Sequence, residues 1–346
     1  MAAAITHGVT TIAYGAQQVG MLVPAAIAQR VVRFVGGARA PQPDRATIKA
    51  LNRRVRELLE RDLANVERGM YPRRLLFSIP VSTYARRLPR LFADFPRSMW
   101  RRRQADYRDL PDEVDARDYP AYFRRTFHWQ TDGYLSRRSA ELYDVGVEFL
   151  FAGTADVMRR QVIPPITTFL RAAGGAKGKR LLDVACGTGR TLAQIAQAHP
   201  GAQALRAGSV ALLRAAGARA PRGRAGRVPR QRERGAHALR RRALRRGHER
   251  VPVPRAAEER AAPRHRRDVP RARARRAPRH RGLGAVRRVL GHPLLPRALP
   301  EDFHEPFYRD YLKDDLRAAL EESGFEVASV DPCFVAKVVV ARKPEC

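Results

Sequence analysis

Residues 180–202, RLLDVACGTGRTLAQIAQAHPGA, carry the clearest sign of a fold class in this chain of 346 residues. The stretch opens with a short apolar run, continues through a loop that holds two glycines, and ends in a segment with apolar side chains at helical spacing. Leu192 and Ile195 fall on one face of that segment. The pattern predicts a strand, a tight loop and a helix, which together form one unit of an α/β domain.

The loop of this unit has the composition of a ligand-binding turn. Gly187 and Gly189 lack a Cβ atom, so the backbone can turn sharply and approach a ligand, and the following helix offers free N–H groups. Asp183 closes the strand with a carboxylate on the side where open α/β sheets bind ligands. A dinucleotide-binding loop needs a third glycine where this chain has Leu192, and the Gly-Lys-Ser/Thr ending of a P-loop is absent. A glycine turn without a ligand is the alternative.

At residues 182–189 the sequence, LDVACGTG, resembles the first motif of class I S-adenosylmethionine-dependent methyltransferases of the type 11/25 kind, which include quinone-biosynthesis enzymes. The resemblance implies a Rossmann-like α/β fold with a seven-stranded sheet and a C-terminal antiparallel hairpin. It also implies S-adenosyl-L-methionine as cofactor, with the glycine loop under its methionine part, and methyl transfer to a small-molecule acceptor. The loop and strand candidates for cofactor binding are Asp183, Ala185, Cys186, Gly187, Thr188 and Gly189.

The aromatic-rich segment 124–165 precedes the motif, much as cofactor-covering helices do in methyltransferases of the quinone-biosynthesis type. The residues that suggest this role are His128, Trp129, Tyr134, Tyr143 and Asp144. Tyr143 is therefore a further cofactor-binding candidate. Core packing of a helical cap explains the same aromatic residues equally well. No residue can be named as a catalytic base, and no metal site is expected.

Residues 1–170 are predicted to form a helical accessory or cap region, and residues 171–346 the methyltransferase domain. Apolar residues recur at helical spacing in 41–69, with charges between them, which indicates an amphipathic helix. Prolines and aromatics in 70–118 indicate short helices and turns.

Three basic residues near the motif, Arg159, Arg160 and Arg171, are expected to face solvent. The C-terminal part reads as a helix at about 312–323, stopped by Gly324, and two β-rich segments at 325–330 and 334–342.

The N-terminus is apolar, but no uninterrupted apolar run reaches the ~20 residues that span a bilayer. A helix packed on its own domain is the favoured interpretation, and peripheral contact with a membrane surface is the alternative. Three cysteines at unrelated spacings, Cys186, Cys333 and Cys346, suggest neither a disulfide framework nor a metal site. They fit a reducing compartment, so a cytoplasmic location is expected.

The segment 203–300 departs from the rest of the chain. It holds 29 arginines, no lysine and 5 acids, a net charge of +24 within a total of +33. It contains no Phe, Tyr, Trp, Ile or Met, so it cannot supply the Val/Ile/Leu-rich strands of a buried parallel sheet. Native strands are therefore not expected in 203–299. It also lacks the acid, about 20 residues after the glycines, that holds the cofactor ribose in this family.

Two interpretations of this segment remain. One is an arginine-rich nucleic-acid-binding protein on a degenerate methyltransferase scaffold, although the segment lacks the aromatics and lysines that usually accompany such arginines. The other is a pair of compensating frameshifts near residues 202 and 299, because Arg, Ala, Pro and Gly are the residues that GC-rich codons give when they are read out of frame.

The genetic code supports the frameshift interpretation. Read one base later, residues 245–269 permit DAVTSVFLFHELPKNARRRVIAEMF, and residues 204–213 permit LYGLDLSPYY, which restores an acid at the position of Gly208. The segment up to 282 then permits PGGLLVIED. These resemble the second, fourth and fifth strands of the family, in order. We therefore expect no specific nucleic-acid partner.

Overall fold

The computed structural model describes residues 2–35, 44–104, 106, 110, 123–124, 126, 135–208, 283–290 and 315–344. The helices before the glycine motif are α1 (Ala2–Val35), α2 (Arg45–Glu67), the 3-10 helix η1 (Arg73–Phe77), α3 (Val81–Ala93), α4 (Phe95–Gln104), α5 (Arg137–Leu150), α6 (Ala155–Arg160) and α7 (Ile163–Ala172). The elements that follow are β1 (Arg180–Val184), α8 (Arg190–Ala198), β2 (Gln203–Ala207), β3 (Leu283–Leu290), α13 (Leu316–Glu322), β4 (Glu326–Cys333) and β5 (Ala336–Arg342).

The helical N-terminal part forms largely where the sequence predicts it. The amphipathic segment 41–69 becomes α2, whose N-terminus is capped by the Asp44 carboxylate through the Thr47 N–H at 2.6 Å. Within the residues that the structure describes, segment 70–118 contains short helices joined by turns, as expected, and segment 124–165 contains α5, α6 and the start of α7. His128, Trp129 and Tyr134 lie outside those residues.

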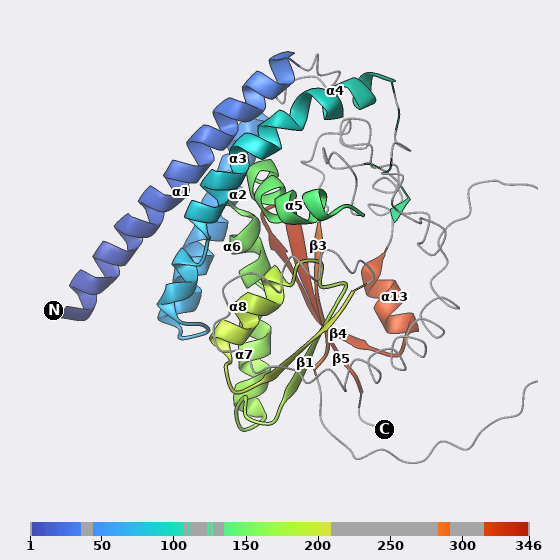
Figure 1. Ribbon diagram of the computed structural model, residues 1–346. Coiled ribbons are helices and arrows are strands. Elements are labelled where there is room, and N and C mark those ends of the chain that lie inside the picture. The colour runs from blue at the N-terminus through green and yellow to red at the C-terminus, as the bar shows by residue number, and fades with distance from the viewer. Residues whose placement is uncertain are drawn as a thin grey trace, which may run out of the picture.

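Helix α1 packs along the outside of the other N-terminal helices (Figure 1). Tyr14 is buried on its inner face, and the Gln17 amide donates a hydrogen bond to the Leu76 carbonyl at 3.1 Å. At Gly153, a Cβ atom would lie 2.8 Å from the Met21 Cβ, so a glycine is needed for the close approach of α1. The prediction of a helix packed on its own domain is confirmed.

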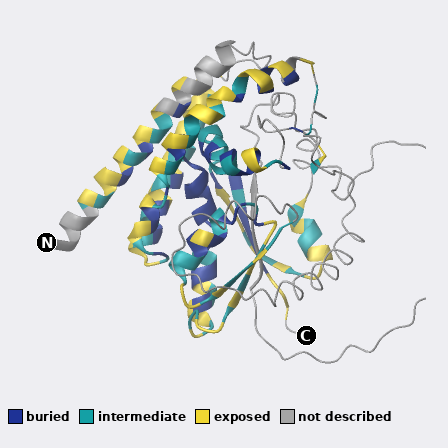
Figure 2. Cartoon of the chain, viewed as in Figure 1, coloured by how far each residue is buried: buried dark blue, intermediate teal, exposed yellow. Residues whose placement is uncertain are grey.

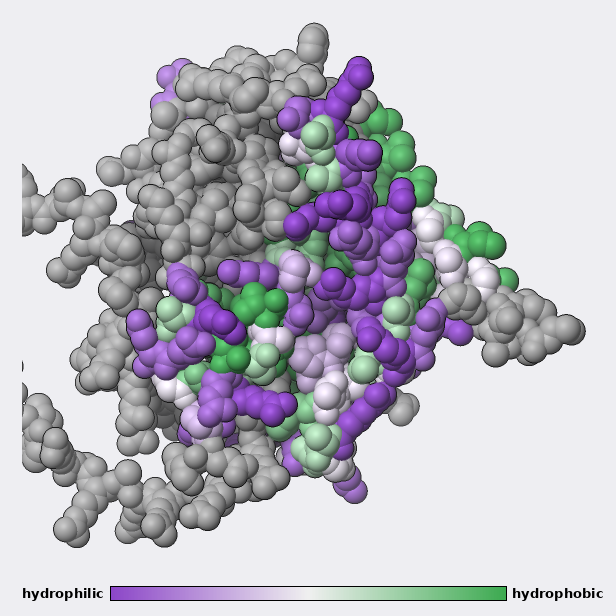
Figure 3. Space-filling model, turned by 180° about the vertical axis from the view of Figure 1, so that it is seen from behind, coloured by the Kyte–Doolittle hydropathy of each residue, from purple (hydrophilic) through white to green (hydrophobic). Residues whose placement is uncertain are grey.

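The outer face of α1 carries apolar side chains. The most exposed are Val9, Ile12, Val19, Val23 and Ile27. Figure 3 shows hydrophobic side chains along this edge of the molecule. Among the described residues, no helix is both long enough and apolar enough to cross a bilayer. Peripheral membrane contact through α1 stays a prediction.

The five described strands form two sheets. Strands β1 and β2 pair in parallel, with Asp183 opposite Arg206. The second sheet has the order β3-β5-β4 with antiparallel pairs throughout. The β-rich segments expected at 325–330 and 334–342 form the hairpin of β4 and β5. The seven-stranded sheet that the resemblance implies is not present among the described residues, and it stays a prediction.

The segment 203–299 differs from the expectation at its two ends. Residues 203–207 pair with β1, and residues 283–290 pair with β5. Parallel and antiparallel ladders use backbone groups, so short stretches can pair even where their side chains are unfavourable. Most of the segment lies outside the described residues, and the proposed shift of its reading frame therefore stays a prediction.

The core lies between the helices and the antiparallel sheet. Its buried members include Leu58 of α2, Met158 of α6, Ile163 of α7 and Val338 of β5. Figure 2 shows buried residues concentrated where α6 and α7 face the strands. This core joins α2 to the hairpin of β4 and β5. At the surface, Arg61 of α2 donates a hydrogen bond to the Pro332 carbonyl at 2.7 Å. The glycine loop stands at the margin of this core.

Candidate functional site

The glycine motif folds into the strand, loop and helix that its sequence predicts. Strand β1 ends at Val184 and α8 begins at Arg190. In the intervening loop, Ala185, Gly187 and Gly189 have positive φ angles of 62°, 53° and 80°. Positive φ angles at alternate positions turn the chain tightly, and glycine adopts this left-handed conformation more readily than other residues.

The two glycines meet different surroundings. A Cβ atom on Gly189 would lie 3.3 Å from Cδ of Arg206, so this position is both left-handed and crowded. A Cβ atom on Gly187 would meet no heavy atom within 4 Å. The loop is anchored by the Cys186 N–H, which donates to the Ala207 carbonyl of β2 at 3.1 Å. The open side of the loop is therefore at Gly187.

Asp183 precedes the loop and has one unsatisfied oxygen. Its Oδ2 atom is buried and has no hydrogen-bond partner among the described residues. Burial raises the pKa of Asp183 to about 6, and the positive charge of Arg206 opposes that increase. A buried carboxylate oxygen without a donor is a group that a ligand N–H or O–H could satisfy.

Helix α5 lies against the loop. The Thr188 hydroxyl donates to Oδ1 of Asp144 at 3.0 Å, and Thr188 itself is buried. Tyr143 is half-buried on the same helix, next to Asp144. The structure thus brings the helix of Tyr143 to the predicted loop residues. The role of Tyr143 in cofactor binding stays a prediction.

A buried charged network fixes the start of α8. Nε of Arg190, the first residue of the helix, donates to Asp156 of α6 at 2.9 Å, and its Nη2 donates to the Ser78 carbonyl at 2.6 Å. Arg159 donates to Asp156 at 2.8 Å and lies 3.7 Å from Asp144. Burial alone would raise the pKa of Asp156, but the two guanidinium groups hold it down to about 2. The C-terminal end of the loop is therefore held by α6.

Glu148 is the second buried carboxylate beside this network. Its two oxygens accept the N–H groups of Ala155 at 2.9 Å and Asp156 at 2.8 Å, which caps the N-terminus of α6. Burial, and then the negative charge of Asp156, raise the pKa of Glu148 to about 7. Sequence patterns missed this carboxylate, because nothing distinguishes Glu148 from the exposed acids of an amphipathic helix.

The expectation that Arg159 and Arg160 face solvent is wrong. Arg159 is 5% exposed and Arg160 is fully buried. Each is paired with a carboxylate, Arg159 with Asp156 and Arg160 with Asp62, and a buried charge needs such a partner. Arg171 is exposed as predicted, and its Nη2 donates to the Gly69 carbonyl at 2.7 Å. In the sequence, the i, i+3 spacing of Asp156 and Arg159 is the sign that these two residues could form an ion pair.

The described residues fit one end of S-adenosyl-L-methionine better than the other. The open backbone at Gly187 and the unsatisfied oxygen of Asp183 suit the methionine part. The ribose part has no carboxylate at the end of β2, where the chain reads Arg206, Ala207 and Gly208. The described residues thus offer groups that could contact the methionine part, whereas no carboxylate is present for the ribose part.

Two cavities among the described residues lie away from the glycine loop. One of about 590 Å³ lies at the opposite end of α8, beside His199. There, Thr167 is within 2.8 Å of Nε2 of His199, and burial, together with Arg171, lowers the pKa of His199. The second cavity lies between α3 and α5. Within the described part of the chain, no three His, Cys, Asp or Glu side chains gather in a metal-binding arrangement.

Comparisons of the chain with protein families, with curated proteins and with solved structures find no match.

Proposed function

We propose that this chain is an S-adenosyl-L-methionine-dependent methyltransferase of the class I lineage that acts on a small-molecule acceptor in the cytoplasm. The observation that carries the proposal is the folding of residues 182–189 into a strand end and a left-handed glycine loop that leads into α8. Among the described residues, Cys186 and Cys333 form no disulfide, which is compatible with a reducing compartment.

The loop residues would hold the methionine part of the cofactor. Backbone atoms at 185–189 would pass under it, and the free oxygen of Asp183 would accept a hydrogen bond from it or from its hydration shell. The bound cofactor supplies a sulfonium methyl group. The chain's own contribution is to orient the acceptor in line with that group, which is the main source of rate in such a reaction.

The missing ribose carboxylate weakens this site. A lost charge-assisted hydrogen bond costs about 1.5–3 kcal/mol, which is roughly a tenfold to a hundredfold loss of affinity. We therefore expect weak binding by the chain as written. We expect tighter binding by a version in which 203–299 is read one base later.

Isothermal titration with S-adenosyl-L-methionine tests the proposal on both versions of the chain. A sharper comparison is Gly208→Asp, which adds one carboxylate just after β2, against Gly201→Asp, which adds the same charge in an exposed turn before it. Gly208→Asp should raise the affinity about tenfold, and Gly201→Asp should not. Equal affinity in all versions, or no binding by the frame-restored chain, would refute the proposal.

Nucleic-acid binding by the arginine-rich segment is the second candidate function. The observation that favours it is the net charge of +24 in 203–300. Any such polycation binds DNA with a steep dependence on salt. Only preference for one sequence or structure at physiological salt would support this function over the methyltransferase.

Peripheral membrane contact is a separate proposal for α1. Its exposed apolar residues, such as Ile12 and Val19, support it. Co-sedimentation with lipid vesicles, compared between the native chain and Ile12→Ser/Val19→Ser, tests it.

A further inference from the structure

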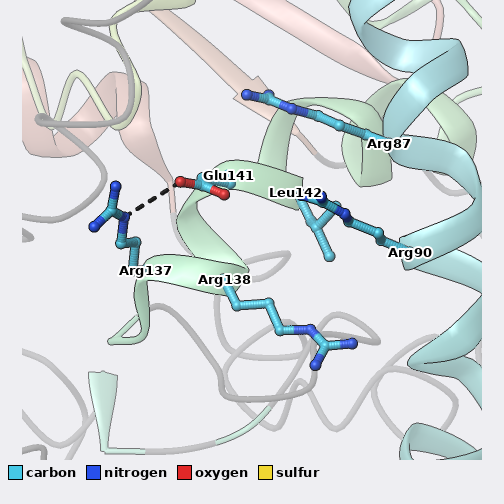
Figure 4. Close-up of a pocket in the computed structure, with 6 residues that line it drawn as sticks. All are labelled: Arg87, Arg90, Arg137, Arg138, Glu141 and Leu142. Atoms are coloured by element: carbon cyan, nitrogen blue, oxygen red, sulfur yellow. Dashed lines mark hydrogen bonds and ion pairs between the residues drawn. The ribbon is translucent and has the colours of Figure 1, made fainter.

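Four arginines surround a cavity between α3 and α5. The cavity measures about 310 Å³, and its lining is made of Arg87, Arg90, Arg137, Arg138, Glu141 and Leu142. Figure 4 shows Arg87 and Arg90 reaching from α3 toward α5, whose N-terminal turns carry the other four residues. The volume is at the lower end of the range for small-molecule pockets.

The arginines of this cavity differ in their partners. Nε of Arg137 lies 3.3 Å from Glu141, and Arg138 is paired with Asp94, whose side chain is buried. The guanidinium groups of Arg87 and Arg90 have no ion-pair or hydrogen-bond partner among the residues that the structure describes. In each of these two ion pairs the charges of the partners cancel. The positive charges of Arg87 and Arg90 therefore remain on the α3 side of the cavity.

The position of these two charges is unfavourable in the absence of an anion. Arg87 and Arg90 are three residues apart on α3, and like charges at this spacing repel each other. Arg86 precedes Arg87 on the helix and is exposed, as Arg90 is, but it does not line the cavity. Two unneutralised guanidinium groups directed into one small cavity are the arrangement that binds a compact dianion.

We propose that this cavity binds the phosphate monoester group of a small molecule. A phosphate monoester carries a charge of about −1.5 to −2 at pH 7, which balances Arg87 and Arg90. Its oxygens accept hydrogen bonds from the planar guanidinium groups in pairs. Leu142 adds an apolar wall for the rest of the ligand.

The cavity lies close to the glycine loop along α5. Glu141 at its rim is one helical turn from Asp144, which receives the hydrogen bond of Thr188. Arg137 is seven residues from Asp144, or about 10 Å along the helix axis. This places the bound phosphate within the reach of one small molecule from the loop. The further step, that the phosphate belongs to the methyl acceptor, rests on the proposed function.

The test is titration of the full chain with inorganic phosphate, in which binding is measured by calorimetry and by the ³¹P NMR line width. Arg87→Gln/Arg90→Gln should weaken binding on the order of tenfold for each arginine removed. Arg86→Gln is the matched control, because it removes the same charge from the same helix outside the cavity. Circular dichroism should show equal thermal midpoints for all three proteins.

The control is necessary because a chain of net charge +33 attracts phosphate at many places. A loss that is equal in Arg86→Gln and in the double variant would overturn the proposal, and so would the absence of a saturable site. If a single-stranded oligonucleotide bound the cavity instead, it would displace phosphate from the native chain and from Arg86→Gln. If the double variant alone lost affinity for the oligonucleotide, the cavity would be assigned to nucleic acid, and the phosphate proposal would be overturned.

Titration with S-adenosyl-L-methionine separates this site from the loop. Cofactor affinity should not change in Arg87→Gln/Arg90→Gln. If phosphate binds in the cavity while no version of the chain binds cofactor, the proposed function fails and the phosphate site stands.

Discussion

The buried ion pair between Asp62 and Arg160 offers the sharpest prediction of stability. Asp62 of α2 accepts hydrogen bonds from Tyr14 at 2.6 Å, from Tyr71 at 2.6 Å and from Nε of Arg160 at 3.1 Å. The carboxylate and the guanidinium are both fully buried. Although burial alone would lower the pKa of Arg160, Asp62 raises it well above its usual value. Asp62 therefore supplies the negative charge that compensates the buried Arg160.

Asp62→Asn removes the negative charge and leaves the positive one buried. Removing one partner of a buried ion pair costs about 3–5 kcal/mol. The amide also directs a donor toward groups that are themselves donors, which adds to the cost. Against a typical domain stability of about 5–15 kcal/mol, this is a large fraction of the whole.

The free energy of unfolding should be measured by urea titration with far-ultraviolet circular dichroism. Limited proteolysis should also show earlier cleavage in α1, because Tyr14 loses its charged acceptor. Glu60→Gln, an exposed acid on the same helix, is the matched control and should change stability by less than about 0.5 kcal/mol.

A double variant distinguishes charge from packing. Asp62→Leu/Arg160→Met removes both charges, and replacing a buried ion pair by apolar residues is often neutral or stabilising. It should therefore be more stable than Asp62→Asn alone. A loss of less than 1 kcal/mol in Asp62→Asn, or a double variant no better than the single one, would show that the pair does not hold α1, α2 and α6 together.

Three other predictions follow from buried or constrained groups. The folded pKa of Glu148, about 7, is above the ordinary value of 4.5, so the stability from its protonated form is complete below about pH 4.5 and is lost as the pH rises toward 7. The free energy of unfolding, measured by urea titration, should therefore fall by on the order of 3 kcal/mol between pH 5 and pH 8 in the native chain but not in Glu148→Gln, and an equal fall in both proteins would contradict this. Gly189→Ala should cost about 1–2 kcal/mol, because alanine is strained at this left-handed φ and its Cβ crowds Arg206; an unchanged urea midpoint would argue against the observed loop. Asp315→Ala should cost about 1 kcal/mol at α13, since the carboxylate accepts the N–H of Arg317 at 2.9 Å, and hydrogen exchange that is no faster in α13 would contradict this cap.

The parts of the fold that the sequence predicts are those with local signals. Helix α2 has a strong apolar period and a capping aspartate, Asp44, and the hairpin of β4 and β5 has runs of β-branched residues. The glycine loop was predictable because Gly187 and Gly189 are needed at left-handed positions. Each of these signals depends on residues within one turn or one strand of each other.

The charged residues of α6 could not be predicted in the same way. Arg159 and Arg160 look like an exposed basic pair in the sequence, yet α6 is covered by α2 and α8 and both arginines are buried. Their partners come from distant segments, since Asp62 is 98 residues away from Arg160. A single sequence does not show which charges meet across such a separation.

The pairing of β1 with β2 involves the first residues of the arginine-rich segment. Strand β2 ends at Ala207, one residue before the position where the shifted frame permits an aspartate. In the literal chain the same strand places Arg206 beside Asp183, and its side chain would crowd a Cβ atom on Gly189. A parallel strand here requires only backbone groups, so its presence is compatible with either frame. The side chains do distinguish the two readings, because Arg206 lies beside Asp183 and the chain has no carboxylate at 206–208. The backbone of β2 is therefore compatible with the proposed methyltransferase, and the missing carboxylate is the reason why we expect weak cofactor binding by the chain as written.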